Sequence, residues 1–265
     1  MNMDKFTDER DDRLLEADRY TFFVLRRVMK GECELLLTDH ERLIICYTGS
    51  PYPVWIWLPD GASRKETERA YKLVKENGLL DGAHTFNMKY ETAEYFIERA
   101  AEDGIKQGIN VNMFAYDCPE PIKPAVSVGG GLYRCTPDDT DEVTELVSGF
   151  WAEALGEKRD RETDRATAEE SISTGKLFLW KTPEGRTAAC CKYIPSGELA
   201  SLGLVYTLPE FRRKHYAQNL VYEVTKLAAG EGYTPMLYTN ADYAASNGCY
   251  VKIGYLLRGR LCTIG

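Results

Sequence analysis

Residues 202–220 read LGLVYTLPEFRRKHYAQNL, a pattern that predicts a strand, a tight basic turn and a helix. The strand is expected to end at Pro209, because proline cannot donate a hydrogen bond to a sheet. Backbone N–H groups at the start of a helix are unpaired and carry partial positive charge. Arg212, Arg213 and Lys214 stand at this start, where cations oppose the helix dipole, so they suggest an anionic partner such as a diphosphate. The alternative is a basic helix start that only contacts solvent.

The rest of the second half alternates strands with helices. Strands are expected over 132–136, 198–209, 234–240 and 255–265 and in a hairpin over 176–195, and helices over 141–155, 211–232 and 244–254. The stretch 156–172 carries charges of both signs, which is typical of a solvated helix or loop.

The first half shows similar patterns. Helices are expected over 11–30, 63–77 and 91–104, and strands over 32–39, 42–49, 51–61, 83–90 and 109–118. Ser63 and Glu66 form a capping-box pattern, and Gly78 is expected to end that helix. Trp55 and Trp57 alternate with apolar residues, as in a strand that is buried on both faces.

A proline- and glycine-rich segment, PEPIKPAVSVGGG over 119–131, predicts a linker between two domains. We place one domain over 1–125, the linker over 126–131 and a second domain over 132–265. The order of elements predicts a mixed α/β layer structure. Because both halves share the coarse order helix, strands and strand–helix–strand, we suspect two copies of one fold.

Two motifs of the second half resemble those of the GNAT superfamily of N-acetyltransferases. The family carries [Gln/Arg]-x-x-Gly-x-[Gly/Ala] at a strand-to-helix turn; Arg212 and Ala217 match its ends, and His215 stands in place of glycine. The family pattern Asn-x-x-Tyr-x-Lys-x-Gly-[Phe/Tyr] is matched in order by Asn247, Tyr250, Lys252, Gly254 and Tyr255. The resemblance covers about 131–265. It implies a mixed, splayed central sheet flanked by helices, in tandem with a degenerate first copy, a layout similar to that of glycine N-acyltransferase-like proteins.

The resemblance also implies acetyl-CoA as co-substrate. The backbone of Leu204, Val205 and Tyr206 would pair with the pantetheine arm like an added strand. The amides of Arg213, Lys214, His215, Tyr216 and Ala217 would hold the pyrophosphate, with Arg212 beside them. A helical φ is acceptable for histidine, so we expect the turn to form with His215 in place.

For catalysis, the resemblance gives Tyr250 the role of general acid toward the leaving thiolate; a packed aromatic side chain is the alternative. Asn247 would orient the coenzyme or cap its helix. Ser201 stands where many family members carry a glutamate. Either a water relayed by Ser201 or a backbone carbonyl would act as base, or the amine would arrive deprotonated. Cys249 has no histidine at a suggestive spacing, so we interpret it as a buried thiol.

Composition narrows the function further. The chain has 33 basic and 41 acidic residues, and a net charge of −8 argues against nucleic-acid binding. No apolar run is long enough for a membrane span, and the charged N-terminus does not resemble a signal peptide. Eight cysteines and three histidines lack metal-ligand spacing, so we expect a cytoplasmic protein without a metal.

The expected activity is therefore the transfer of an acetyl group to an amine of a small molecule, amino acid or peptide. One alternative is a non-catalytic acyl-CoA-binding regulatory module, which the departures at His215 and Ser201 favour. The other is an aminoacyl-tRNA-dependent transferase, against which the negative charge argues. The acidic helix start at 91–104 disfavours a phosphate, so no coenzyme is expected there in the first half.

Overall fold

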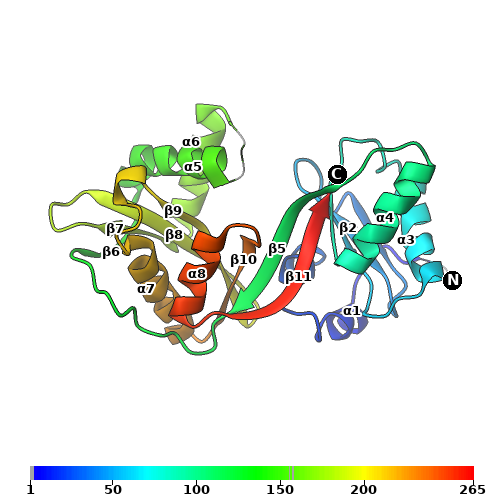
Figure 1. Ribbon diagram of the computed structural model, residues 1–265, viewed down its shortest axis with the longest axis horizontal. Coiled ribbons are helices and arrows are strands. Elements are labelled where there is room, and N and C mark those ends of the chain that lie inside the picture. Colours follow the sequence, from blue (N-terminus) through cyan, green and yellow to red (C-terminus); the bar gives the residue numbers. More distant parts are fainter. Residues whose placement is uncertain (1–2, 155, 157) are drawn as a thin grey trace. The chain divides into compact units, whose positions relative to one another are not determined.

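The computed structural model describes residues 3–154, 156 and 158–265, which group into two compact units (Figure 1). Unit 1 comprises the described residues up to Ala115, together with Thr239–Tyr243 and Leu257–Gly265. Unit 2 comprises Tyr116–Tyr238 and Ala244–Leu256. Each unit is therefore built from separate stretches of the chain.

These units do not follow the predicted domain limits. Residues 116–131 group with unit 2, and most of the last strand groups with unit 1. A compact unit need not coincide with a domain, so the limits 1–125, 126–131 and 132–265 stay a prediction.

Unit 1 contains four short helices and a set of strands among its described residues. Its elements are α1 (Glu9–Leu14), α2 (Phe23–Val28), β1 (Leu35–Thr38), β2 (Ile44–Tyr47), β3 (Val54–Trp57), α3 (Arg64–Glu76), β4 (Phe86–Met88), α4 (Tyr90–Glu102), most of β5 (Ile109–Asp117) and most of β11 (Leu256–Ile264). The strands β1, β2 and β3 are antiparallel neighbours, β4 lies parallel to β3, and β11 runs antiparallel to β4.

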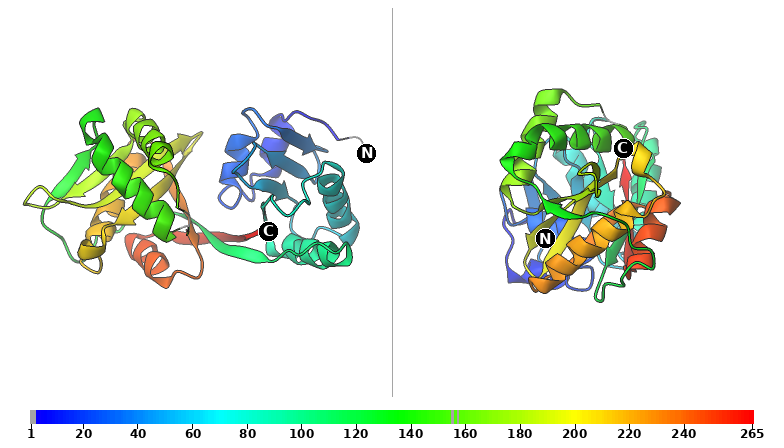
Figure 2. Two further views of the ribbon diagram at one scale, coloured as in Figure 1. Left: turned by 90° about the horizontal axis from the view of Figure 1, so that it is seen from above. Right: turned by 90° about the vertical axis from the view of Figure 1, so that its left-hand side faces the viewer.

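Helices α3 and α4 pack against each other and against these strands (Figures 1 and 2). The predicted capping box of α3 is present: Ser63 accepts from the backbone of Glu66, whose carboxylate accepts from the backbone of Ser63. Gly78 follows the helix with a φ of +74°, a conformation that glycine adopts without strain. The side chains of Trp55 and Trp57 are buried, as expected for β3.

Unit 2 has a second mixed set of strands. Its elements are β6 (Gly131–Arg134), the 3₁₀ turn η1 (Pro137–Asp139), α5 (Thr140–Ala154), α6 (Arg161–Ser173), β7 (Leu177–Lys181), β8 (Thr187–Ser196), β9 (Leu199–Thr207), the 3₁₀ turn η2 (Pro209–Phe211), α7 (Tyr216–Gly230), β10 (Thr234–Asn240, within unit 2 to Tyr238) and α8 (Ala244–Ile253). The order of hydrogen-bonded strands is β10-β9-β8-β7-β6, and only the β10–β9 pair is parallel.

Helices cover both faces of the unit 2 strands (Figures 1 and 2). On one face α5 and α6 bury apolar side chains against β7, β8 and β9, with Val143, Leu146 and Ile172 in this core. On the other face lie α7 and α8. The mixed α/β class expected from the sequence is thus confirmed.

Most predicted elements are present, but the single helix over 11–30 is wrong. Helix α1 ends at Leu14 and α2 begins at Phe23. Between them Asp18 accepts hydrogen bonds from Trp57 Nε1 (2.8 Å) and Lys89 Nζ (2.6 Å). We attribute the break to these contacts within unit 1, which outweigh the apolar periodicity.

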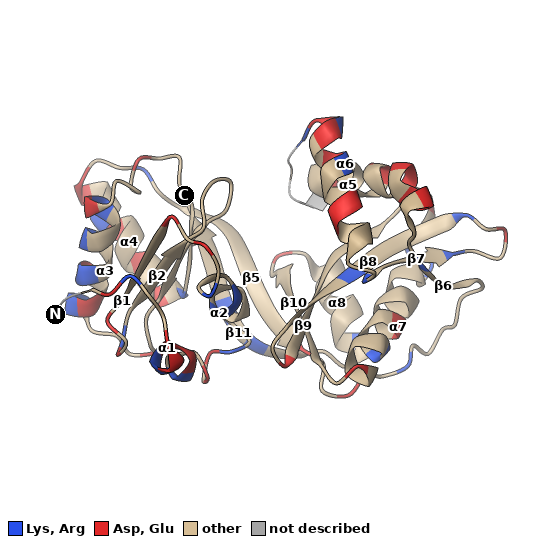
Figure 3. Cartoon of the chain, turned by 180° about the vertical axis from the view of Figure 1, so that it is seen from behind, with Lys and Arg blue, Asp and Glu red and all other residues tan. Residues whose placement is uncertain are grey.

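The charged stretch 156–172 forms helix α6 from Arg161 onward, which carries basic and acidic residues (Figure 3) and buries Asp164, Ala168, Ser171 and Ile172. Leu155, the last residue of the helix predicted over 141–155, and Glu157 lie outside the described residues. Across the described part of the chain, none of the helices combines the length and the apolar character that crossing a membrane requires.

Candidate active site

Strands β9 and β10 of unit 2 stay paired only at their start. Residues Leu199 to Ser201 of β9 pair with Thr234 to Met236 of β10. Strand β9 continues to Thr207 without a further partner on β10. The backbone of β9 beyond Ser201 therefore faces no ladder partner on β10. Ligands of α/β proteins bind where neighbouring strands separate at their carboxyl ends.

A bulge lies on β9 just beyond this point. The register between β8 and β9 shifts between Cys190 and Lys192, so Cys191 opposes both Leu204 and Val205. Leu204 has a left-handed backbone with φ 50°. A bulge takes a residue out of the ladder and bends the strand, and such bulges occur beside active sites. Leu204 and Val205, which the resemblance places along the pantetheine arm, are thus the two residues with irregular pairing.

The turn before α7 contains two further left-handed residues. Arg213 has φ 59°, and His215, the N-cap residue of α7, has φ 64° and ψ 7°. The expectation of a helical φ at His215 is wrong. This is the region in which glycine is free of strain, and it explains why the family motif has glycine at this position. Left-handed residues in a turn aim successive N–H groups into a concavity that suits an anion.

The start of α7 offers its amides without a side-chain cap. His215 makes no capping hydrogen bond, and the first turn of α7 contains no acidic residue. The ring of Tyr216 packs edge-on against Phe211 at 5.5 Å. Asn219, one turn into the helix, donates to the carbonyls of Val126 (2.9 Å) and His215 (3.0 Å), which ties the 119–130 segment to the helix start.

Arg212 is bound within unit 2 by the carboxylate of Glu153, a residue that no sequence motif marks. Its Nη2 donates to Glu153 on α5 (2.5 Å), and its Nε donates to the carbonyl of Thr207 (3.0 Å). Tyr206 donates to the same Glu153 carboxylate (2.7 Å). The hydrogen bonds from Tyr206 and Arg212 lower the pKa of Glu153, and burial with this carboxylate raises the pKa of Tyr206 to about 12. No sequence signal could join Glu153 to a turn so far along the chain.

Tyr250 on α8 is 7% exposed, and its ring stands edge-on to Tyr255 at 5.8 Å. Burial raises its pKa well above the ordinary value, with smaller contributions from the thiols of Cys249 and Cys191. Since Cys191 is the β8 residue opposite the bulge, Tyr250 lies near the irregular part of β9. A phenol that stays protonated at neutral pH is suited to donate a proton.

The remaining predicted residues hold positions around these elements. Asn247 accepts a hydrogen bond from Tyr116 (3.3 Å). Ser201 is half-buried at the last recorded β9–β10 pair, opposite Met236. Cys249 is half-buried and not fully buried as expected. Desolvation still raises the pKa of its thiol to about 11, so the thiol stays protonated and does not suit a nucleophile.

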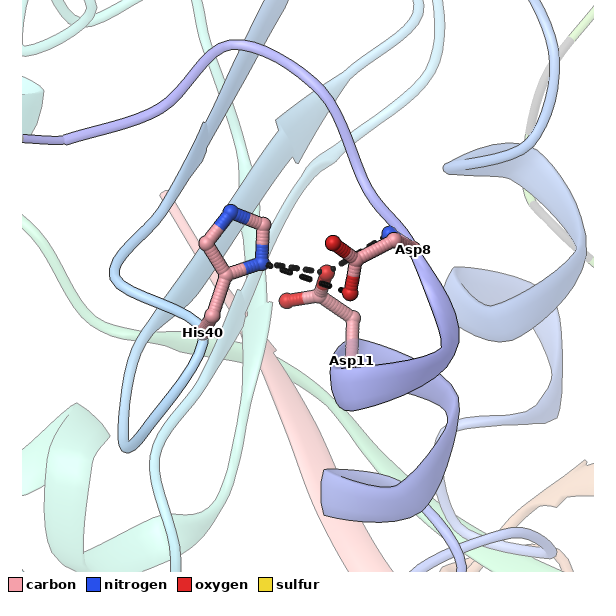
Figure 4. A group of neighbouring side chains, drawn as sticks. All are labelled: Asp8, Asp11 and His40. Atoms are coloured by element: carbon pink, nitrogen blue, oxygen red, sulfur yellow. Dashed lines mark hydrogen bonds and ion pairs between the residues drawn. The ribbon is translucent and has the colours of Figure 1, made fainter.

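In unit 1, Asp8, Asp11 and His40 lie close together and are of the residue types that bind metals (Figure 4). Their spacing in the sequence did not indicate this group. His40 Nδ1 contacts Asp11 Oδ2 at 2.8 Å, and the backbone N–H of Asp8 donates to the same oxygen. Thr38 donates to the other Asp11 oxygen (2.6 Å). Both Asp11 oxygens already accept hydrogen bonds, so the arrangement acts as a cap for α1.

Comparisons with known proteins show which fold the chain shares with them. A family model described as FR47-like protein matches residues 183–263. No curated protein sequence matches the chain. A GCN5-related N-acetyltransferase from Sphaerobacter thermophilus superposes with a TM-score of 0.66 at 14% identity, covering 96% of this chain and 90% of that chain.

Two more solved structures extend over both units. A Drosophila protein matches with a TM-score of 0.68 at 14% identity, covering 99% of this chain and 97% of that chain. A tandem GNAT protein from the clavulanic acid biosynthesis pathway matches with a TM-score of 0.50 at 15% identity, covering 84% and 77%. The chain therefore has the GNAT acetyltransferase fold in a tandem arrangement. More particularly, residues 183–263 are similar to the FR47-like family.

Proposed function

We propose that the protein is an acetyl-CoA-dependent N-acetyltransferase whose unit 2 holds the coenzyme and transfers the acetyl group to a primary amine. The observation that carries this proposal is the uncapped start of α7, with left-handed Arg213 and His215, after a strand that has left its neighbour β10. A diphosphate is the ligand chemistry that such a turn accepts.

The residues present fit the coenzyme along its length. The backbone of β9 from Leu204 to Tyr206, which has no ladder partner on β10, suits a pantetheine amide chain, which adds to a strand edge. The amides from Arg213 to Ala217 suit the diphosphate, and the small side chain of Ala217 lets the backbone approach closely. Arg212 supplies a guanidinium beside them, already oriented by Glu153.

The chemistry is direct acyl transfer, for which acetyl-CoA supplies an electrophilic thioester. The amine nitrogen forms a bond to the carbonyl carbon, and the carbon–sulfur bond breaks as the tetrahedral intermediate collapses. Tyr250 donates its proton to the leaving thiolate and is reprotonated from solvent. Ser201, at the point where β9 leaves β10, relays the proton of the amine through a water.

The acceptor is an amine of a small molecule, amino acid or peptide, and neither nucleic acid nor membrane takes part. The acidic chain attracts cationic amines over long range. We propose a cytoplasmic location, because the eight cysteines suit a reducing compartment.

The first test is calorimetric titration of the full chain with acetyl-CoA. We expect a dissociation constant near the micromolar range, about −8 kcal/mol of binding free energy. The absence of saturable binding would refute the proposal.

The second test is an amine screen that monitors release of free thiol. Tyr250→Phe should lower turnover about 100-fold with little change in coenzyme affinity, because general acids contribute about 10²–10⁴-fold. Tyr222→Phe on α7 is the matched control and should behave as the wild type. Coenzyme binding without turnover of any amine would favour the non-catalytic acyl-CoA-binding module.

A further inference from the structure

Unit 1 contains a cleft of about 650 Å³ that plays no part in the proposed reaction. It lies where the parallel strands β3 and β4 end. The two strands pair only as far as Trp55 and Asn87, and the residues that follow them, Asp60 and Lys89, line the cleft. Carboxyl ends of separating parallel strands are where α/β proteins bind small ligands, and pockets of roughly 300–1,000 Å³ hold them.

The floor of the cleft is formed by the ammonium group of Lys89 and the two carboxylates that bind it. The Lys89 side chain is only 10% exposed, and its Nζ donates to Asp18 Oδ2 and to Asp60 Oδ1, both at 2.6 Å. Asp18 is held in turn by Trp57 Nε1. Asp60 is 90% exposed, so its carboxylate faces the open side. Two carboxylates against one cation leave the floor with a negative charge.

One wall is a chain of oriented polar groups. Tyr90 donates to Asn112 Oδ1 (2.7 Å), and Asn112 Nδ2 donates to the exposed Asp242 (2.8 Å). Arg260 belongs to the same lining and lies over the ring of Phe114 at 5.3 Å. Within the described part of the chain, the Arg260 guanidinium meets no carboxylate at ion-pair distance. The cleft thus presents an available cation together with exposed carboxylates.

Chain order shows which ligand this cleft does not suit. In each unit, three consecutive antiparallel strands lead through a helix to a strand parallel to the third: β1–β3, α3 and β4 in unit 1, and β7–β9, α7 and β10 in unit 2. The cleft of unit 1 therefore corresponds to the separation of β9 and β10. The amides at the start of α3, however, are capped by Ser63 and Glu66, so the helix of unit 1 that corresponds to α7 offers no open start to a diphosphate.

We propose that this cleft binds a small zwitterion, a free amino acid or a dipeptide. The carboxylate of the ligand pairs with Arg260, and its ammonium group pairs with Asp242 and Asp60. Four carboxylates and three basic side chains line the cleft. A ligand that carries one charge of each sign therefore finds a group of opposite charge for each of its ends. This site does not depend on coenzyme binding by unit 2.

The test is calorimetric titration of the full chain with the twenty L-amino acids, glycylglycine and L-alanyl-L-alanine. We expect saturable binding for at least one zwitterion. Its N-acetylated form, which lacks the ammonium group, and its C-terminal amide, which lacks the carboxylate, should each bind about 10-fold or more weakly, since each loses a charge-assisted contact.

Two pairs of variants locate the site. Arg260→Gln and Asp242→Asn should each weaken binding about 10-fold or more. Arg13→Gln on α1 and Asp138→Asn in η1 remove exposed charges away from the cleft lining and should bind as the wild type does. Far-UV circular dichroism and acetyl-CoA titration check that each variant is folded. The proposal would be overturned if no compound of the panel bound, or if Arg260→Gln and Asp242→Asn both bound the ligand as tightly as the wild type does.

Discussion

Helices α3 and α7 occupy the same place in the two units, yet their first turns are opposite in chemistry. At α3, Ser63 and Glu66 form a capping box, and Arg42 binds the Glu66 carboxylate. At α7, the corresponding positions hold His215 and Gln218, whose side chains approach at 3.4 Å without capping the helix. One helix start is closed by side chains of the chain itself, and the other has no side-chain cap.

Two units with the same order of strands and helix thus differ in the chemistry of one helix start. The first amides of a helix have no partners within the helix and need acceptors from elsewhere. In unit 1 the acceptors are covalently part of the chain, which stabilises the fold. In unit 2 the start of α7 has no side-chain cap, and His215 has a strained left-handed backbone.

The largest effect should come from placing a carboxylate at the second helical position of α7. Ala217→Asp brings a negative charge to within about 4 Å of the diphosphate, a repulsion of about 4 kcal/mol, and should weaken acetyl-CoA binding by more than about 100-fold. Calorimetric titration measures this. The matched control is Lys65→Asp, at the same position of α3, which should leave coenzyme affinity unchanged. Equal affinity in Ala217→Asp would remove the diphosphate from this turn.

A second experiment transplants the α3 cap onto α7. The double variant His215→Ser/Gln218→Glu copies the N-cap and N3 residues of α3, so its own carboxylate competes for the amides. We expect acetyl-CoA to bind about 10- to 100-fold more weakly. The reverse pair in α3, Ser63→His/Glu66→Gln, should leave coenzyme binding as it is. If the transplanted cap had no effect, the open helix start would not be the feature that distinguishes the units.

Local patterns were sufficient to predict most of the fold. The strand–turn–helix at 202–220 and the capping box at 63–66 are short-range features, and both are present in the structure. The helix expected over 11–30 failed because Asp18 binds partners that lie 39 and 71 residues away in the chain. Apolar periodicity carries no information on such contacts.

The candidate site was predictable only in part for a similar reason. Residues of the turn and of α8 were identified through motifs, and their roles stay predictions. Glu153 could not be found, because its partners Tyr206 and Arg212 lie more than 50 residues away and no local pattern marks it. The left-handed conformation of His215 was also missed, since a side chain in place of glycine suggests the ordinary helical backbone.

Removing the cap of α3 should have an effect of intermediate size. Ser63→Ala leaves backbone amides at the start of α3 without their acceptor and should lower the free energy of unfolding by about 1 kcal/mol. Urea denaturation followed by circular dichroism measures the change. Ser127→Ala, in the exposed segment before β6, is the control. Acetyl-CoA affinity should be the same in both variants, because the cap belongs to unit 1.

A smaller effect is expected at the other helix start. His215→Gly relieves a left-handed backbone worth about 1 kcal/mol, but glycine adds flexibility to the unfolded chain, so the net gain in unfolding free energy is about 0.5 kcal/mol. Coenzyme affinity should be equal or tighter, since the turn keeps its shape. His84→Gly, at a position without a left-handed backbone, should not stabilise the chain. A large loss of affinity in His215→Gly would instead make the histidine a ligand contact.

The smallest effect is a pH dependence that belongs to α3 alone. Hydrogen bonds from Arg42 and then Ser63 lower the pKa of Glu66 to about 2. Because the folded pKa lies below the unfolded value, about 4.3 for glutamate, the stabilisation is present above the unfolded value and is lost as the pH falls toward 2. Glu66→Gln should remove about 0.5 kcal/mol of this dependence, a size typical of exposed charge pairs.

Urea denaturation at pH 5 and pH 3 compares the wild type with this variant and with Glu120→Gln as control. An unchanged difference between the two pH values in Glu66→Gln would show that the carboxylate does not close the start of α3, and the contrast with α7 would then rest on the backbone of His215 alone.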